Sequence, residues 1–246
     1  MTRIVKIEKT GGPEVLKFET TKLGKPEAEE VLIEHKAIGL NFIDTYHRSG
    51  LYPLELPSQL GLEGAAVITD LGKDVDGFML GDRVAYVGLP IGAYSEQRNY
   101  PANGLVKIPE NVSDDLAAAS MLKGLTAWYL VNKSYPIQIG DDVLIYAAAG
   151  GVGLFLSQWA KHLGARVIGI VSTLEKAELA QLNGCSEIIY ADDKQLIKKT
   201  RQLTNGKGVA AVYDSVGKET FYQSLDCLRP HGVMVSYGNA TGAVEP

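Results

Sequence analysis

One stretch in the second half of the chain constrains its fold more than any other. The segment 142–147, which is apolar after Asp142, has the character of a buried strand, and it leads directly into Ala147-Ala-Ala-Gly-Gly-Val-Gly153. Apolar side chains then recur at helical spacing on one face of the following segment, and these are Val152, Leu156, Trp159, Ala160 and Leu163. A strand, a glycine-rich turn and an amphipathic helix in this order predict one unit of a parallel α/β sheet.

The glycine spacing in this turn is that of a dinucleotide-binding loop. Ala148, Gly150 and Gly153 take the three positions of the G-x-G-x-x-G pattern, with alanine at the first. Gly150 would let the backbone approach a pyrophosphate, and Gly153 would let the helix pack closely on the strand. The N–H groups at the start of the helix, at Gly151 and Val152, would bind the phosphates. The alternative is a tight turn that binds nothing, but the strand and helix on either side favour a nucleotide site.

The residues after the next strand discriminate between the two nicotinamide nucleotides. Enzymes that use NAD place an Asp or Glu there to hold the ribose hydroxyls, whereas here strand 166–171 is followed by Ser172 and Thr173, with Lys176 one turn later. Two hydroxyls and a cation would hold a 2′-phosphate, so NADPH is predicted over NADH. In the alternative, Ser172 only caps the next helix in a capping box with Glu175, and Lys176 is solvated.

Composition excludes several other classes of protein. Residues 143–160 carry no charge over a length near that of a membrane span, but the glycines in the middle favour the strand, turn and helix. The net charge of −5 disfavours nucleic acid and anionic membranes as partners. Two cysteines, Cys185 and Cys227, fit a reducing compartment. Because the charged N-terminus does not read as a signal peptide, we predict a cytoplasmic protein.

Strand and helix patterns alternate through residues 121–246, which predicts a doubly wound parallel sheet with helices on both faces. The strands are predicted at residues 142–147, 166–171, 188–190, 209–214 and 232–236. The helices are predicted in an alanine-rich segment capped by Ser113 and at residues 122–131, 152–163, 172–184, 196–203 and 219–228. A dinucleotide-binding sheet has six strands, so we expect a sheet truncated after its fifth strand: either the last strand is absent or the sequence is a fragment.

Residues 1–120 follow the pattern of a small, irregular β-domain instead. Apolar and polar residues alternate with a period of two in several short runs, and turn residues separate these runs. The strands are predicted at residues 3–8, 31–38, 65–71, 83–87 and 94–100.

Five short motifs, each weak alone, are specific when taken together. They are Asn41-Phe-Ile-Asp-Thr-Tyr46, Arg48-Ser-Gly-Leu-Tyr-Pro53, Gly61-Leu-Glu-Gly64, Lys123-Gly-Leu-Thr-Ala127 and Ala147-Ala-Ala-Gly-Gly-Val-Gly153. In these motifs the chain resembles the zinc-independent NADPH:quinone oxidoreductases, the zeta-crystallin-like branch of the medium-chain dehydrogenase/reductase superfamily. The resemblance implies a GroES-like catalytic domain at residues 1–120, a Rossmann NADPH-binding domain at residues 121–246, and a substrate cleft between them.

The sequence departs from the zinc-dependent members of this superfamily. Where those alcohol dehydrogenases carry a cysteine, this chain has Asn41, and where they carry Gly-His-Glu it has Leu62 in place of the histidine. A catalytic zinc needs about three Cys, His or carboxylate ligands at one point. His35 and His47 lie in the same half of the chain, but no cysteine does. We therefore predict that no metal is bound.

The resemblance also implies which residues form the site. Around the nicotinamide and the substrate it places Asn41, Asp44, Tyr46 and Tyr52. Near the cofactor it places Lys123, Thr126, Ser215, Gly238 and Asn239. Tyr46 or Tyr52 would donate a hydrogen bond to the developing oxyanion, and Asp44 would orient other groups rather than act as a base. In the alternative, both tyrosines are held at a domain rim by packing alone.

Three functions are compatible with these features. The first is metal-free hydride transfer from NADPH to a quinone, and the second is NADPH-dependent reduction of the double bond of an enone or alkenal. The third is a non-catalytic nucleotide-binding protein of the crystallin type. A homodimer is expected if the C-terminal part of the sheet is present.

Overall fold

The computed structural model of the chain describes residues 1–245. The chain divides into two compact units, Met1–Leu122 and Lys123–Pro246, which we call unit 1 and unit 2. This division lies two residues after the predicted boundary between residues 120 and 121. Helix α2 (Asp114–Tyr129) carries the chain from one unit to the other.

Unit 2 is built on a parallel sheet of five strands in the order β11-β10-β9-β12-β13. The strands are β9 (Asp142–Ile145), β10 (Arg166–Val171), β11 (Glu187–Tyr190), β12 (Val209–Asp214) and β13 (Leu228–Ser236). This order, with β9 in the middle, is that of the first five strands of a dinucleotide-binding sheet. The predicted doubly wound sheet is confirmed, and residues 1–245 contain no sixth strand in it.

Helices cover both faces of this sheet. Successive residues of a strand point to opposite faces, so apolar neighbours in a strand pack against different helices. The helices are α3 (Gly151–His162), α4 (Leu174–Leu182), α5 (Leu196–Leu203) and α6 (Phe221–Cys227). Val143 of β9 belongs to a buried cluster that includes Leu156 of α3. Its neighbour Leu144 belongs to a second buried cluster, with Leu196 of α5 and Cys227 of α6.

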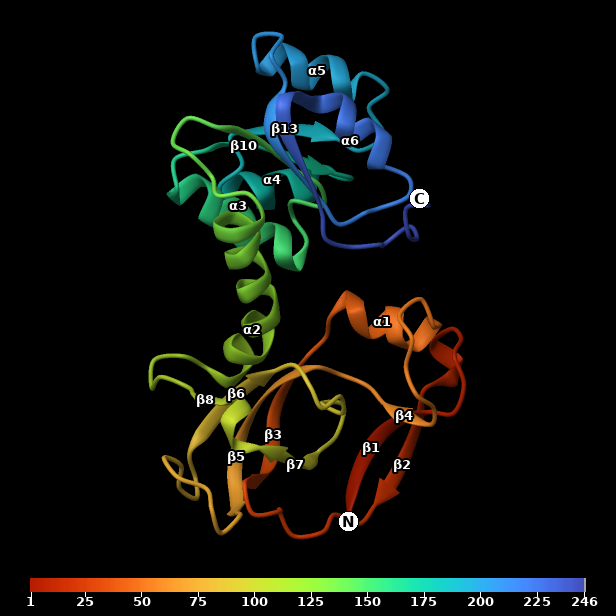
Figure 1. Ribbon diagram of the computed structural model, residues 1–246, viewed down its shortest axis with the longest axis vertical. Helices are drawn as coiled ribbons and strands as arrows, with labels where there is room; N and C mark the ends of the chain where they lie inside the picture. Colours follow the sequence, from red (N-terminus) through yellow and green to blue (C-terminus); the bar gives the residue numbers. More distant parts are fainter. Residues whose placement is uncertain (246) are drawn as a thin grey trace. The chain divides into compact units, whose positions relative to one another are not determined.

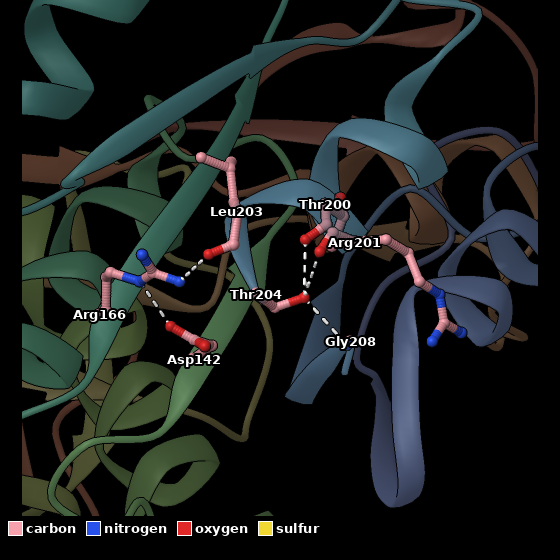
Figure 2. Close-up of polar contacts among 7 residues, drawn as sticks. All are labelled: Asp142, Arg166, Thr200, Arg201, Leu203, Thr204 and Gly208. Carbon is pink, nitrogen blue, oxygen red and sulfur yellow. Dashed lines mark hydrogen bonds and ion pairs between the residues drawn. The ribbon is translucent and has the colours of Figure 1, made fainter. Parts of the chain in front are cut away.

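Polar contacts fix the C-terminal end of α5 to the amino ends of two strands (Figure 2). Arg166, at the start of β10, donates a hydrogen bond from Nε to Asp142 Oδ1 at 2.6 Å and another from Nη2 to the carbonyl oxygen of Leu203. The hydroxyl of Thr204 accepts the N–H of Gly208 at 2.9 Å. Ligands of doubly wound sheets bind at the carboxyl ends of the strands, so this cluster has a structural role.

Unit 1 contains two antiparallel sheets, with strand orders β7-β3-β5-β6-β8 and β2-β1-β4 (Figure 1). The strands are β1 (Thr2–Ile7), β2 (Lys17–Thr21), β3 (Glu30–Gly39), β4 (Ser58–Gln59), β5 (Glu63–Leu71), β6 (Arg83–Val87), β7 (Gln97–Pro101) and β8 (Leu105–Lys107), with short 3-10 helices at Pro13–Val15 and Ala102–Gly104. The predicted β-rich domain is confirmed, and β2, β4 and β8 are strands that the sequence did not indicate. Val31, Ile33, Tyr86 and Tyr100 are central to its core.

Two helices differ from the prediction. Helix α1 (Phe42–Ser49) lies in unit 1, in a segment where no helix was predicted. The two helices predicted between residues 113 and 131 are one continuous helix, α2, followed by a π-helical turn at Leu130–Ser134. The predicted cap is correct, because Ser113 Oγ accepts the N–H of Leu116 at 3.2 Å. Gly124 does not interrupt α2, since an isolated glycine weakens a helix without ending it.

The uncharged segment 143–160 forms β9, the glycine turn and α3, as predicted. No helix among residues 1–245 is both long enough and apolar enough to span a bilayer.

Both cysteines of the chain are buried free thiols in unit 2. Burial raises the pKa of Cys185 and of Cys227, which keeps both sulfur atoms protonated.

Candidate active site

In the turn between β9 and α3, the backbone segments are so close that a side chain has no room. A Cβ at Gly153 would lie 2.2 Å from the carbonyl oxygen of Ala147, and one at Gly150 would lie 3.0 Å from the same atom. Gly150 is the N-cap of α3, and as a glycine it has no side chain with which to cap the helix. The first N–H groups of α3 are therefore available to a ligand, which fits the pyrophosphate of a dinucleotide.

Helix α2 contributes a side chain to the same turn. A Cβ at Gly151 would meet Cδ of Lys123 at 2.8 Å, so the aliphatic part of Lys123 lies directly against the glycine. Thr126 is three residues further along α2 and is half-buried. The structure thus brings Lys123 to the turn.

The junction between β10 and α4 gathers the residues predicted to bind a 2′-phosphate. Lys176 Nζ donates a hydrogen bond to Ser172 Oγ at 3.0 Å, and both residues are exposed, as is Thr173. The residue that caps α4 is Thr173, whose Oγ1 accepts the N–H of Lys176 at 3.3 Å. The suggestion that Ser172 is the cap is therefore wrong by one residue, because α4 begins only at Leu174. This leaves the hydroxyl of Ser172 beside a cation, where an anion can bind.

Ser215, Gly238 and Asn239 follow the carboxyl ends of the neighbouring strands β12 and β13. A Cβ at Gly238 would lie 2.7 Å from the carbonyl oxygen of Ser215, so the two loops are in direct contact. The fully buried Asp214 shapes the first loop, since its Oδ1 accepts the N–H of Val216 at 2.7 Å. Asp214 directly precedes the predicted site residue Ser215, and its place at the end of β12 is the sequence signal that indicates it.

In unit 1, helix α1 gathers the predicted catalytic residues. Asn41 is its N-cap, Asp44 and Tyr46 lie within it, and Tyr52 follows it. The backbone N–H of Tyr52 donates to the carbonyl oxygen of Tyr46 at 3.2 Å, and the two rings have centroids 5.0 Å apart. Asn41, Asp44 and Tyr46 are buried, and Tyr52 is half-buried.

Hydrogen bonds connect α1 to distant parts of unit 1. Asp44 Oδ2 accepts the N–H of Asn41 at 2.9 Å and the hydroxyl of Tyr94 at 2.8 Å. The Asn41 side chain donates from Nδ2 to Glu63 Oε1 at 2.8 Å, and Glu63 Oε2 accepts the N–H of Leu122 at 2.7 Å. Burial raises the pKa of Asp44, and the hydrogen bonds from Asn41 and Tyr94 partly oppose this.

Glu63 and Tyr94 are missing from the predicted site. Glu63 belongs to the motif Gly61-Leu-Glu-Gly64, so its position in the sequence was a usable signal. For Tyr94 no local signal exists, because its partner Asp44 is 50 residues away in the chain.

Comparison with known proteins agrees with this architecture. Residues 27–110 match the family described as alcohol dehydrogenase GroES-like domain, and residues 151–245 match the one described as zinc-binding dehydrogenase. The chain is 48% identical to a quinone oxidoreductase of Pseudomonas aeruginosa over 245 residues, which cover 99% of this chain and 75% of that protein. The chain belongs to the quinone oxidoreductase family. This membership, within the medium-chain dehydrogenase/reductase superfamily, confirms the predicted resemblance, including the GroES-like and Rossmann domains.

Two further relatives inform the chemistry of this family. A solved quinone oxidoreductase of Escherichia coli in complex with NADPH has 46% identity and a TM-score of 0.96, with 100% of this chain and 76% of that chain covered. A 2-haloacrylate reductase of Burkholderia is 47% identical, with 98% of this chain and 74% of that protein covered. The chain spans about three quarters of the length of these quinone oxidoreductase relatives.

The donor set of unit 1 does not fit a catalytic zinc ion. The amide of Asn41 faces Glu63, and both oxygens of Glu63 already accept hydrogen bonds. Within the described residues, no group of three His, Cys, Asp or Glu side chains is placed to hold a metal ion. The name of the matching zinc-binding family therefore does not carry its metal over to this quinone oxidoreductase.

Proposed function

We propose that the chain is an NADPH-dependent quinone oxidoreductase, which adds a hydride and a proton to a quinone and gives the hydroquinone. The observation that carries the proposal is the glycine turn. A Cβ at Gly153 would lie 2.2 Å from the carbonyl oxygen of Ala147, so only glycine lets the amino end of α3 approach the edge of the sheet this closely. The relatives named quinone oxidoreductase, one of them solved with NADPH, support the choice of cofactor and acceptor.

Unit 2 would hold the cofactor. The N–H groups of Gly151, Val152 and Gly153 would bind the pyrophosphate, and Lys123 and Thr126 would lie close to it. The residues that would bind the 2′-phosphate are Ser172, Thr173 and Lys176, and those that would line the nicotinamide side are Ser215, Gly238 and Asn239. The bound cofactor supplies the hydride, because no amino-acid side chain can donate one.

Unit 1 would supply the groups that act on the acceptor. A quinone carbonyl gains negative charge as it is reduced, and the hydroxyl of Tyr46 or Tyr52 would stabilise that charge by donating a hydrogen bond. Asp44 and Asn41 would orient this segment, because both residues are buried and Asp44 Oδ2 and Asn41 Nδ2 are bonded to protein groups. We assign no role as a general base to Asp44.

A second candidate function is the reduction of an activated carbon–carbon double bond. The 47% identity with a 2-haloacrylate reductase favours it, since that name describes an electron-poor alkene as acceptor. The same side chains would serve both reactions, because each adds a hydride to a carbon chain or ring that is conjugated to a carbonyl group.

Oxidation of NADPH in the presence of a panel of quinones and enones tests the proposal. We expect turnover with a quinone, no loss of activity on treatment with a chelator, and a lower KM for NADPH than for NADH. Turnover with enones alone would favour the second function. NADPH binding without turnover on any acceptor would instead indicate the non-catalytic, crystallin-like protein.

The small-molecule acceptor is the only partner that the proposal requires. The homodimer and the cytoplasmic location stay predictions from the sequence.

A further inference from the structure

A half-buried tyrosine outside the predicted site, Tyr94, bonds directly to a residue within it. The hydroxyl of Tyr94 donates to Asp44 Oδ2 at 2.8 Å, and the same oxygen accepts the backbone N–H of Asn41 at 2.9 Å. Asp44 is only 4% exposed, so water does not substitute readily for either donor. Tyr94 therefore holds the carboxylate that in turn holds the first residue of the α1 segment.

The chain of hydrogen bonds continues through the side chain of Asn41. Its Nδ2 donates to Glu63 Oε1 at 2.8 Å, and a carboxylate can only accept, so the amide must turn its nitrogen toward Glu63. Glu63 is fully buried and is itself fixed by the N–H of Leu122 at 2.7 Å. Asn41 is thus held at its backbone by Asp44 and at its side chain by Glu63.

The ring of Tyr94 is placed by packing, independently of its hydroxyl. Gly61 has a left-handed φ of 94°, and a Cβ there would lie 2.5 Å from Cδ1 of Tyr94. The ring packs against a buried cluster of Ile7, Val15 and Leu60. Removal of the hydroxyl alone would therefore leave the ring in place.

We propose that Tyr94 is a positioning residue for the reaction: its hydroxyl holds Asp44, and through Asp44 it holds Asn41 and the amino end of α1. The inference rests on the proposed function, because α1 and the segment after it carry Tyr46 and Tyr52. Without the hydroxyl, α1 would keep its residues but lose a fixed orientation. A small misplacement of groups around a reacting atom lowers the rate more than it lowers binding.

The ionisation of Asp44 gives this role a signature in pH. The groups that act on Asp44 are Asn41, Tyr94 and His47, which lower its pKa, and Glu63, which raises it together with burial, the largest cause. Burial also raises the pKa of Tyr94, so its hydroxyl stays a donor. Loss of that donor raises the pKa of Asp44 further, and the carboxylate is then protonated at a higher pH.

The test compares Tyr94→Phe with the matched control Tyr86→Phe. Tyr86 is a tyrosine of unit 1 that is fully buried, and its hydroxyl contacts Nε2 of His35 at 2.6 Å, outside the hydrogen bonds around Asp44. We expect Tyr94→Phe to lower kcat about tenfold, to move the acid limb of the kcat profile to higher pH, and to leave the Kd for NADPH unchanged. Tyr86→Phe should leave kcat and the profile as in the wild type.

The same measurements in an Asp44→Asn background complete the test and remain informative if the single variant folds poorly. If Tyr94 acts through Asp44, Tyr94→Phe has no further effect on kcat in that background. Three results would overturn the positioning role and leave the proposed function intact. They are a wild-type kcat with an unshifted pH profile in Tyr94→Phe, an equal loss of kcat in Tyr86→Phe, and fully additive losses of kcat when Tyr94→Phe is combined with Asp44→Asn. A wild-type protein without turnover on quinones or enones would overturn the proposed function and this inference together.

Discussion

The candidate site residues of the two units differ in the kind of groups that they offer. In unit 2 the site is mostly backbone: glycines without room for a Cβ, a helix end and two strand ends. In unit 1 these residues are buried or half-buried side chains, and their hydrogen bonds join residues 22, 50 and 59 positions apart. A site made of backbone requires that certain positions carry no side chain. A network of side chains requires that every hydrogen-bonding partner is present.

The largest effect should come from adding one carbon atom to the backbone site. In Gly153→Ala the new Cβ would lie 2.2 Å from the oxygen of Ala147, which belongs to the backbone and cannot move aside. We expect the Kd for NADPH to rise at least about 100-fold and the protein to lose about 3 kcal/mol of stability, the cost of severe overpacking. Fluorescence titration with NADPH and urea unfolding measure the two effects.

Gly124→Ala is the matched control for this substitution. Gly124 lies in α2, and a Cβ there would meet nothing within 4 Å. Alanine is the better helix former, so we expect stability to rise by about 0.5–1 kcal/mol with unchanged NADPH binding. Equal losses in both variants would show that the effect at Gly153 is not specific to the turn.

The next effect distinguishes the units by their response to acid. In unit 1 the ring of His35 contacts the carbonyl oxygen of Ser95 at 2.7 Å through Nδ1 and the hydroxyl of Tyr86 through Nε2. Burial lowers the pKa of His35 to about 4. The unfolded chain, with a histidine pKa of about 6.5, takes up the proton first. Neutral His35 thus contributes to the free energy of unfolding above about pH 6.5. This contribution falls by about 3 kcal/mol as the pH falls toward 4.

Asp44 opposes part of this loss, since its raised pKa makes the folded state bind a proton before the unfolded chain does. Both tryptophans, Trp128 and Trp159, lie in unit 2. Their fluorescence therefore follows unit 2, while hydrogen exchange at the amides of Val31 and Ile33 follows unit 1. We expect unit 1 to open first as the pH falls, and His35→Gln, which can make both contacts without a charge, to reduce the difference. Simultaneous opening with no effect of His35→Gln would contradict this.

The smallest effect concerns the junction between β10 and α4, where unit 2 relies on exposed side chains. Lys176→Glu places a negative charge beside Ser172 Oγ, which Lys176 contacts at 3.0 Å. We expect the KM for NADPH to rise about tenfold, the equivalent of one charge-assisted contact, and the KM for NADH to change little. Lys198→Glu, an equal charge change at an exposed position of α5, controls for net charge. An equal rise for both nucleotides would remove Lys176 from the 2′-phosphate site.

The same contrast explains what could be predicted from the sequence. The limits of β10 and β12 and the position of the glycine turn follow from local periodicity, because each depends on neighbouring residues. Helix α1 was missed because Ile43, Thr45 and its aromatic residues have low helix propensity. It is held by the contact of Asp44 with its N-cap and by Gly50, with a φ of 84°, at its end.

Long-range partners were beyond such reasoning. Tyr94 and Leu122 enter the network through contacts that only the folded chain brings about. Thr173, rather than Ser172, caps α4 because the helix begins at Leu174, and sequence patterns fix helix ends only to within one or two residues.

The buried thiols of unit 2 have a chemical consequence for a protein that handles such acceptors. Quinones and enones are electrophiles that alkylate thiolates by conjugate addition, and the thiolate is the reactive form of cysteine. Cys185 and Cys227 are 5% and 0% exposed, and their protonated sulfur atoms offer no nucleophile. Burial thereby shields these two thiols from alkylation by such acceptors.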